Sequence, residues 1–205
     1  MVALTEHYYS HQPSVASDRQ IWDFTLRGNK LLFTTDQGVF SKKEVDFGSR
    51  VLIEAFTFPE IKGAILDVGC GYGPIGLSLA KERSSVEITM IDVNERAIEL
   101  ARLNAQKNNI TNVHIFKSDC YDALKVDDQY AAILTNPPIR AGKKVVHAIL
   151  EGAVQRLLPN GELWVVIQKK QGAPSALEKM EDLFGEVEVV EKKKGYYIIR
   201  AKKVD

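Results

Sequence analysis

The chain has 205 residues, 45% of them hydrophobic, with 27 basic and 27 acidic side chains and a formal net charge of zero. This length and apolar content suit one domain with its own core, and zero net charge argues against non-specific coating of nucleic acid. The sequence shows no signal-peptide pattern and no run as long as a membrane span, and it has only two cysteines. We therefore expect a cytoplasmic, single-domain protein without disulfides or membrane contact.

Residues 1–62 have the weakest pattern of the chain. A strand is predicted at 31–35, pairing with a short strand at 38–40, and a helix follows from about 47 to 58. We expect this segment to cover the binding site of a core formed by residues 63–205.

From residue 63 onward, apolar strands alternate with helical patterns. Strands are predicted at 64–68, 86–91, 113–117, 130–135 and 162–168, and helices at 74–83, 95–107, 143–157 and 175–184. This alternation predicts a doubly wound α/β fold with a mostly parallel sheet. The last two strands, 187–190 and 196–201, leave no room for a crossover helix, so they are predicted to form a terminal antiparallel hairpin.

The first core strand runs into a glycine-rich loop. Gly69, Gly71 and Gly73 allow positive φ angles and close approach of a ligand to the backbone. A G-x-G-x-x-G match from Gly71 to Gly76 leaves a nicotinamide-dependent oxidoreductase as one alternative. Asp67 argues against it, because a carboxylate at this strand end would repel a pyrophosphate.

Further candidate residues follow the second and third core strands. Asp92 ends the second strand, where its carboxylate can accept hydrogen bonds from both hydroxyls of a ribose, and Asn94 is the expected N-cap of the next helix. Cys70 and Cys120 have no evident histidine partner, so a nucleophilic role is not favoured. The four histidines lack metal-ligand spacing, and we expect no metal.

The sequence Asn136-Pro137-Pro138 follows the fourth core strand. Two prolines fix the backbone and supply no N–H group, so the side-chain oxygen of Asn136 and the carbonyl of Pro137 are available as acceptors. Together they suit the two hydrogens of an exocyclic amino group. A proline-stiffened turn without function is the simple alternative.

Basic side chains follow the fourth and fifth core strands: Arg140, Lys143, Lys144, Lys169 and Lys170. If these strands are neighbours in a parallel sheet, their carboxyl ends share an edge and the cations flank Asn136, where they would bind substrate phosphates. Ordinary solvated side chains are the alternative for each. The run Lys192 to Lys194 is interpreted as a soluble hairpin turn.

Four motifs in order resemble class I S-adenosylmethionine-dependent methyltransferases. They are Asp-Val-Gly-Cys-Gly-Tyr-Gly from Asp67, then Asp92, Ser118-Asp119, and Asn136-Pro137-Pro138-Ile139. Gly-Val-Phe-Ser (38–41) and Val-Asp-Phe-Gly-Ser (45–49) further resemble the small methyltransferase domain of the small-subunit rRNA guanine-N2 methyltransferases. The resemblance covers nearly the whole chain and implies a seven-stranded, Rossmann-like methyltransferase sheet.

The resemblance also implies a cofactor, a partner and a site. S-adenosylmethionine would be the cofactor and RNA the partner, with guanine N2 of small-subunit rRNA as the first candidate acceptor. The implied cofactor residues are Asp67, Gly69, Cys70, Gly71, Gly73, Asp92, Asn94, Asp119, Cys120 and Phe40, with Asp46 nearby. The implied amine and base contacts are Asn136, Pro137, Pro138 and Ile139.

One position departs from the family motif. The family commonly has an aromatic residue that stacks on the target base where this chain has Ile139, which forfeits part of that stacking energy. The sequence therefore predicts the methyl-transfer reaction more firmly than it predicts which group accepts the methyl. Adenine N6, a protein glutamine amide and a non-catalytic RNA-binding role remain alternatives.

Overall fold

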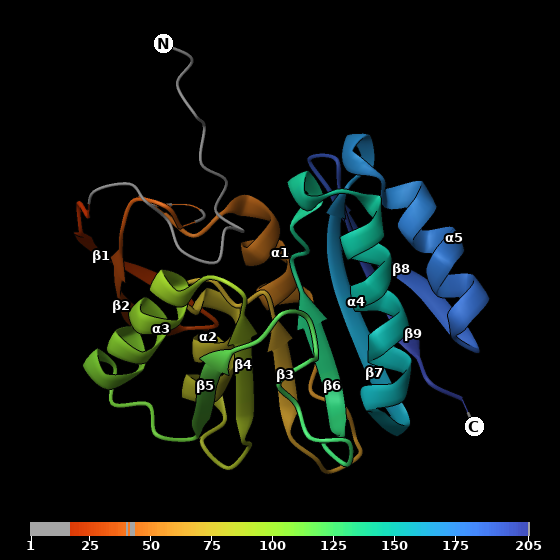
Figure 1. Cartoon of the computed structure of the whole chain (residues 1–205), viewed down its shortest axis with the longest axis horizontal. Coiled ribbons are helices and arrows are strands. Elements are labelled where there is room, and N and C mark those ends of the chain that lie inside the picture. The colour runs from red at the N-terminus through yellow and green to blue at the C-terminus, as the bar shows by residue number, and fades with distance from the viewer. Residues whose placement is uncertain (1–16, 40, 42–43, 205) are drawn as a thin grey trace.

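A seven-stranded sheet with the strand order β5-β4-β3-β6-β7-β9-β8 forms the core of the protein (Figure 1). The computed structural model describes residues 17–39, 41 and 44–204. The parallel strands are β3 (Ile65–Val68), β4 (Ile88–Asp92), β5 (Val113–Lys117), β6 (Tyr130–Thr135) and β7 (Leu157–Gln168). Strand β9 (Tyr196–Lys202) lies antiparallel between β7 and β8 (Glu186–Lys193). The predicted doubly wound sheet and its terminal antiparallel hairpin are confirmed.

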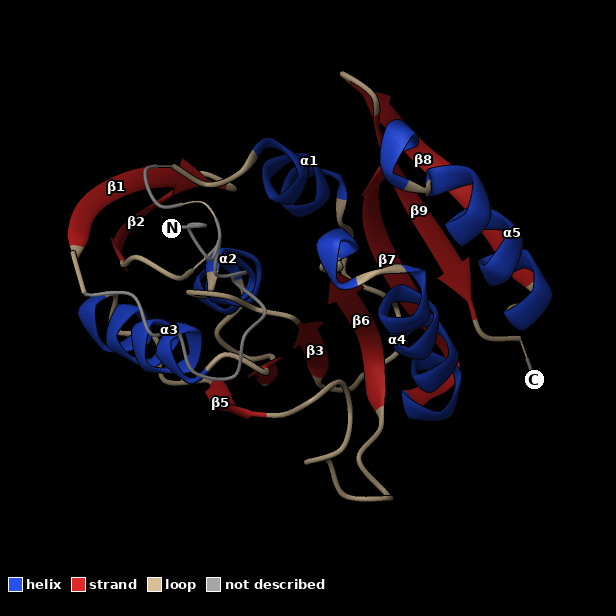
Figure 2. Ribbon diagram, turned by 45° about the horizontal axis from the view of Figure 1, so that its top comes forward, coloured by secondary structure: helices blue, strands red, loops and turns tan. Residues whose placement is uncertain are grey.

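Helices cover both faces of this sheet (Figures 1 and 2). Among the described residues the α-helices are α1 (Phe47–Ala55), α2 (Pro74–Glu82), α3 (Glu95–Lys107), α4 (Lys143–Arg156) and α5 (Ala173–Leu183). One apolar cluster joins α1, α2 and α3 to the sheet, and a second joins α4 and α5 to the opposite face. Because both faces are covered, strands such as β3 and β6 are buried along their whole length and are mostly apolar. No helix in the described ranges has the length and apolar content needed to cross a bilayer.

Strands β1 (Gln20–Leu26) and β2 (Asn29–Thr35) form a separate antiparallel pair beside α2 and α3 (Figure 2). The predicted pairing of residues 31–35 with 38–40 is wrong, because residues 29–35 pair with residues 20–26 instead. Arg27 and Gly28 make the turn, with φ angles of 48° and 73° that suit a two-residue hairpin.

Asn104 of α3 and Asn108, the C-cap of this helix, bind the free side of β2 as a neighbouring strand would. Asn104 Oδ1 accepts a hydrogen bond from Thr34 N–H at 2.7 Å, and Asn108 Oδ1 accepts one from Leu32 N–H at 2.8 Å. Their Nδ2 groups donate to the carbonyls of the same two strand residues. The hairpin is thus fixed to the core through side chains.

Candidate active site

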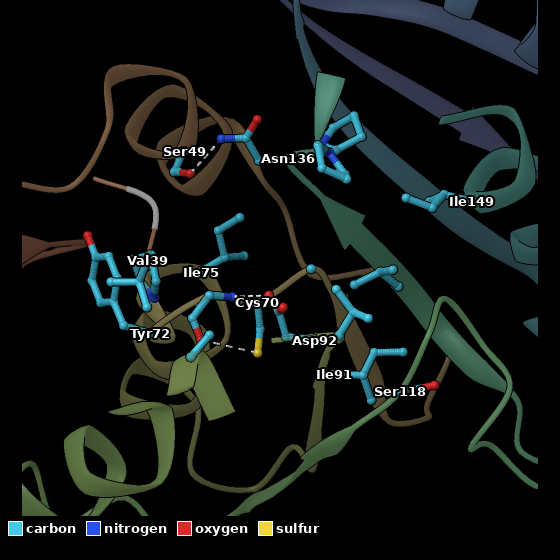
Figure 3. Close-up of a pocket in the computed structure, with 18 of the residues that line it drawn as sticks. Val39, Ser49, Cys70, Tyr72, Ile75, Ile91, Asp92, Ser118, Asn136 and Ile149 are labelled. Carbon is cyan, nitrogen blue, oxygen red and sulfur yellow. Dashed lines mark hydrogen bonds between the residues drawn. The ribbon is translucent and has the colours of Figure 1, made fainter. Parts of the chain in front are cut away.

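A cavity lies at the carboxyl ends of β3, β4 and β6, the edge at which doubly wound sheets bind ligands (Figure 3). The glycine loop after β3, the end of β4, the turn after β5 and the Asn-Pro-Pro turn after β6 all line it. The N-terminal segment contributes Val39, Ser41, Asp46 and Ser49. Segments far apart in the sequence therefore meet around one cavity.

The glycines of the loop serve two purposes. Gly69 and Gly71 line the cavity with φ angles of 74° and 57°, and a Cβ atom on either would meet no atom within 4 Å. That open space allows a ligand to lie against the backbone. Gly73 is different, because its Cβ would lie 2.7 Å from Leu77 Cδ1. Its predicted role in ligand approach is corrected to the tight start of α2.

Asp92 is fixed by two backbone groups at the cavity wall. The Gly71 N–H donates to Oδ2 at 2.8 Å and the Asn94 N–H donates to Oδ1 at 2.8 Å. Burial raises the pKa of Asp92, and these hydrogen bonds oppose the rise. Each carboxylate oxygen keeps a lone pair after these bonds, so Asp92 can still accept hydrogen bonds from a ligand.

Asp67 lies outside the cavity lining, with a relative exposure of 1%. Its Oδ2 accepts a hydrogen bond from Gly76 N–H at 2.8 Å, and its Oδ1 has no hydrogen-bond partner among the described residues. Burial, together with the charge of Asp92, raises the pKa of Asp67 to about 7. Asp67 therefore orders the first turn of α2 through Gly76, and its implied contact with the cofactor stays a prediction.

The raised pKa of Asp67 predicts a pH-dependent stability. The carboxyl titrates near 4 in an unfolded chain, so between about pH 4 and pH 7 only the folded state holds the proton. The contribution of the protonated Asp67 carboxyl to the free energy of unfolding is fully present below about pH 4. It decreases as the pH rises and is lost as the pH passes through 7. We expect the free energy of unfolding of wild type, relative to Asp67→Asn, to fall by up to about 1.4 kcal/mol per pH unit in this range. Urea unfolding of both proteins measures it, and a pH-independent difference would contradict it.

Asn136 is held by two side chains at the start of α1. Its Nδ2 donates to Asp46 Oδ2 at 3.1 Å. The same nitrogen donates to Ser49 Oγ at 3.0 Å (Figure 3). A carboxylate can only accept hydrogen bonds, so Asp46 fixes the amide with its nitrogen toward α1. The amide oxygen makes no hydrogen bond to any residue that the structure describes. It is therefore available to a ligand.

Asp46 is itself anchored as the N-cap of α1. Both its carboxylate oxygens accept from the Ser49 N–H, at 3.2 and 3.3 Å. The same residue thus caps the helix and orients Asn136, and the helix start supplies Ser49 as the second contact. This places a rigid element behind the Asn-Pro-Pro turn.

Ile139 does not line the cavity. Pro137 and Pro138 line the cavity, whereas the chain then turns into the short 3-10 helix η1 (Ile139–Ala141). Ile139 is half-buried and packs against the apolar cluster beneath α4. The side chain thus contributes to this core, and its implied contact with the substrate stays a prediction.

Most of the implied cofactor residues meet at the cavity. Those that line it are Gly69, Cys70, Gly71, Asp92, Asp119 and Cys120. Asn94 does not; it is buried, its Oδ1 accepts from Ala97 N–H at 3.2 Å as the N-cap of α3, and its Nδ2 donates to the Gly38 carbonyl. The predicted N-cap is confirmed, and the implied cofactor contact is corrected to this structural role. Phe40 lies outside the described residues.

Neither cysteine at the cavity is suited to nucleophilic attack. Burial raises the pKa of the Cys70 thiol well above its usual value, and burial with the charges of Asp119 and Asp122 raises the pKa of Cys120 to about 11. Both thiols are therefore protonated near neutral pH, and thiolate is the reactive form. The cavity is better suited to positioning than to covalent catalysis.

The predicted cations follow β6 and β7 and do not line the cavity. Arg140 lies in η1, Lys143 and Lys144 begin α4, and Lys169 and Lys170 lie in the 3-10 helix η2 (Lys169–Gln171) after β7. All five are exposed, and within the described part of the chain none forms an ion pair. Their charge is available to an anionic partner.

Sequence reasoning missed several lining residues. Of these, Ser49 could have been predicted from the sequence, because it follows the predicted site residue Asp46 by three positions, which is the spacing of an N-cap contact. Val39 and Ile149 close the cavity with apolar side chains. No local pattern separates these from ordinary core residues.

Comparison with known proteins places these features in context. The family model described as methyltransferase small domain matches residues 30–200. YbxB of Bacillus subtilis, an uncharacterized protein, is 64% identical over 201 residues, which cover 98% of this chain and 100% of YbxB. Ribosomal RNA small subunit methyltransferase C of Vibrio vulnificus is 33% identical over 162 residues, which cover 77% of this chain and 46% of that protein.

A solved structure shows the same architecture. The T. thermophilus 16S rRNA N2 methyltransferase RsmC, in complex with AdoMet and guanosine, superposes with a TM-score of 0.81 at 25% sequence identity. The match covers 93% of this chain and 52% of RsmC. The chain thus spans about half the length of these rRNA methyltransferases and the full length of the Bacillus protein.

Proposed function

The chain belongs to the methyltransferase small domain family, and we propose that it methylates the exocyclic N2 of a guanine in small-subunit rRNA, with S-adenosylmethionine as the methyl donor. The observation that carries this proposal is the orientation of Asn136, whose nitrogen is bound by Asp46 and Ser49 and whose oxygen is left for a ligand. The guanine assignment is supported by the relatives, one of which was solved with guanosine.

The cavity residues suit the proposed cofactor. The open loop at Gly69 and Gly71 accommodates its methionine portion, Asp92 accepts hydrogen bonds from ribose hydroxyls, and Asp119 accepts one from the adenine amine. When bound, the cofactor supplies a methyl group already activated on a sulfonium.

The protein's part in the reaction is to hold the acceptor. The Asn136 side-chain oxygen and the Pro137 carbonyl accept the two N–H groups of the target amine, which draws the nitrogen lone pair out of conjugation. Apolar lining from Val39, Val68 and Ile149 restricts water in the cavity. No protein nucleophile is needed, in agreement with the protonated thiols.

Methyl transfer in vitro tests this proposal. Purified protein, methyl-labelled S-adenosylmethionine and unmodified small-subunit rRNA, naked or assembled with ribosomal proteins, should yield labelled N2-methylguanosine after nuclease digestion. Label in N6-methyladenosine would redirect the proposal to adenine. Label in ribosomal protein and none in RNA would replace it with amide methylation.

Asp46→Asn should impair catalysis more than folding or cofactor binding. Asparagine still caps a helix, but its amide can donate as well as accept, so it no longer dictates the orientation of Asn136. We expect kcat to fall about tenfold, equivalent to about 1.4 kcal/mol, near the low end for a hydrogen bond to a charged group. Ser49→Ala, which leaves Asp46 in place, should lower kcat by a smaller factor. Unchanged kcat in Asp46→Asn, measured with stability and S-adenosylhomocysteine affinity as controls, would contradict the positioning role.

Replacing Lys143 and Lys144 with alanine should weaken RNA binding and spare the cofactor. Each lost phosphate contact lowers the log–log slope of affinity against salt by roughly 0.7 for single-stranded RNA, so the pair should lower it by about 1.4. The matched control is Lys62→Ala/Lys125→Ala, two exposed lysines at the opposite edge of the sheet, before β3 and β6. Coincident slopes for wild type and the Lys143/Lys144 variant would show that these lysines are solvated surface.

A further inference from the structure

The turn between β8 and β9 lies at the same edge of the sheet as Asn136 (Figure 1). Strand β6 ends at Thr135, which pairs with Val165, and β7 continues to Gln168, about 10 Å further at roughly 3.3 Å per residue. Strand β9 begins beside that extension, with Tyr196 paired to Gln168. The turn therefore extends beyond the carboxyl end of β6, which carries the target-amine site, and β7 lies between the two.

This turn is tied to the segment that carries Lys169 and Lys170. The Lys169 N–H donates to the Gly195 carbonyl at 2.7 Å. Four exposed lysines are brought together by this contact, and we call them the turn patch: Lys169, Lys170, Lys193 and Lys194. Within the described residues, one ion pair offsets their charge, between Lys193 and Glu191 at 3.8 Å.

Lys194 occupies a backbone conformation that lysine rarely adopts. Its φ is 48° and that of Gly195 is 81°, as in a two-residue hairpin turn with both central residues left-handed. Asparagine, aspartate or glycine is favoured at the first of these positions, so lysine makes the turn less stable than it could be. Arg27 adopts the same conformation in the turn between β1 and β2, so the backbone alone does not indicate a function. The charge of Lys194 is relevant because its turn lies at the edge of the sheet that carries Asn136.

The ammonium group of Lys194 is also held in place. Its Nζ lies 5.0 Å from the centroid of the Phe47 ring, which packs against Tyr196 with a centroid distance of 5.6 Å. Phe47 directly follows Asp46, which orients Asn136. A cation that is already positioned beside the site loses less freedom when it binds an anion.

From these observations we propose that the turn patch binds backbone phosphates of the RNA strand that flanks the target nucleotide. The inference rests on the proposed function, because it takes RNA as the substrate. Arg140, Lys143 and Lys144 directly follow the Asn-Pro-Pro turn, so the RNA strand would meet cations from a second segment of the chain near the inserted base. The proposal is an alternative to the interpretation of Lys192 to Lys194 as only a soluble turn.

The double variant Lys193→Gln/Lys194→Asn tests this patch. Asparagine suits the left-handed position, so the protein should fold with equal or greater thermal stability. Two lost phosphate contacts should lower the salt slope for a single-stranded fragment of small-subunit rRNA by about 1.4, or roughly 25-fold in affinity at 0.1 M salt relative to 1 M. Affinity for S-adenosylhomocysteine should be unchanged. Lys194→Arg and the control Lys62→Ala/Lys125→Ala should keep the wild-type slope.

The outcomes separate this inference from the proposed function. A variant slope equal to that of wild type, with methylation of guanine intact, would overturn the turn patch alone. Wild-type protein that binds S-adenosylhomocysteine but shows no salt-dependent RNA binding would overturn the patch together with the RNA assignment. A lower salt slope in Lys193→Gln/Lys194→Asn, together with a wild-type slope in the separate variant Lys194→Arg, supports the turn patch.

Discussion

Replacement of Asn136 by alanine is expected to lower kcat by about two to three orders of magnitude, because one hydrogen bond that strengthens in the transition state is lost. The dissociation constant of S-adenosylhomocysteine should stay within about threefold, since Asn136 is proposed to contact the amine. Single-turnover methylation of small-subunit rRNA measures the first quantity and calorimetry the second.

Thermal unfolding controls for damage to the fold in this variant. Asn136 is partly exposed, and its loss also removes the partner of Asp46 and Ser49, so a small loss of stability is expected. Ser49→Ala serves as the matched control that keeps the amide oxygen. Activity near the wild-type level in Asn136→Ala would remove Asn136 from the amine site.

Replacement of Asp92 by alanine is expected to weaken cofactor binding by about one to two orders of magnitude, or roughly 1.5 to 3 kcal/mol, the cost of losing hydrogen bonds to a charged acceptor. Part of this loss comes from the loop, because Asp92 also accepts from the Gly71 N–H. Calorimetric titration with S-adenosylhomocysteine measures the change. Unchanged affinity in a folded Asp92→Ala protein would exclude Asp92 from the cofactor site.

The core of the fold could be predicted from the sequence because its strands are buried on both faces. Strand β6 reads as an unbroken apolar run and occupies residues 130–135, as predicted. Strand β7 begins five residues earlier than the predicted 162, because Leu157 already pairs with Tyr130 before an irregularity in the register. Such an irregular start leaves no periodic pattern in the sequence.

The N-terminal hairpin was mispredicted for two physical reasons. Arg27 adopts a positive φ angle, which is uncommon for arginine. The sequence Arg27-Gly28 therefore predicts a two-residue turn only weakly. The hairpin is then fixed by Asn104 and Asn108, which lie 70 and 76 residues from their partners in β2. Contacts at that separation follow from the tertiary fold.

In the candidate site, too, the positions of residues at strand ends could be predicted, whereas contacts between residues far apart in the sequence could not. Asp92 and Asn136 follow strand ends, where chain order alone brings them to one edge of the sheet. The hydrogen bonds from Asn136 to Asp46 and Ser49 span 90 and 87 residues, so the orientation of the amide was not accessible from local sequence. Ile139 was assigned by motif position, and its packing against the core after the turn into η1 was not accessible from the motif.

Mass analysis of nucleosides in small-subunit rRNA from cells that lack the protein tests the central claim most directly. We predict the loss of one N2-methylguanosine, its restoration by the wild-type gene, and no restoration by Asn136→Ala expressed at the same level. An unchanged content of N2-methylguanosine at every position of the small-subunit rRNA would contradict the proposed function.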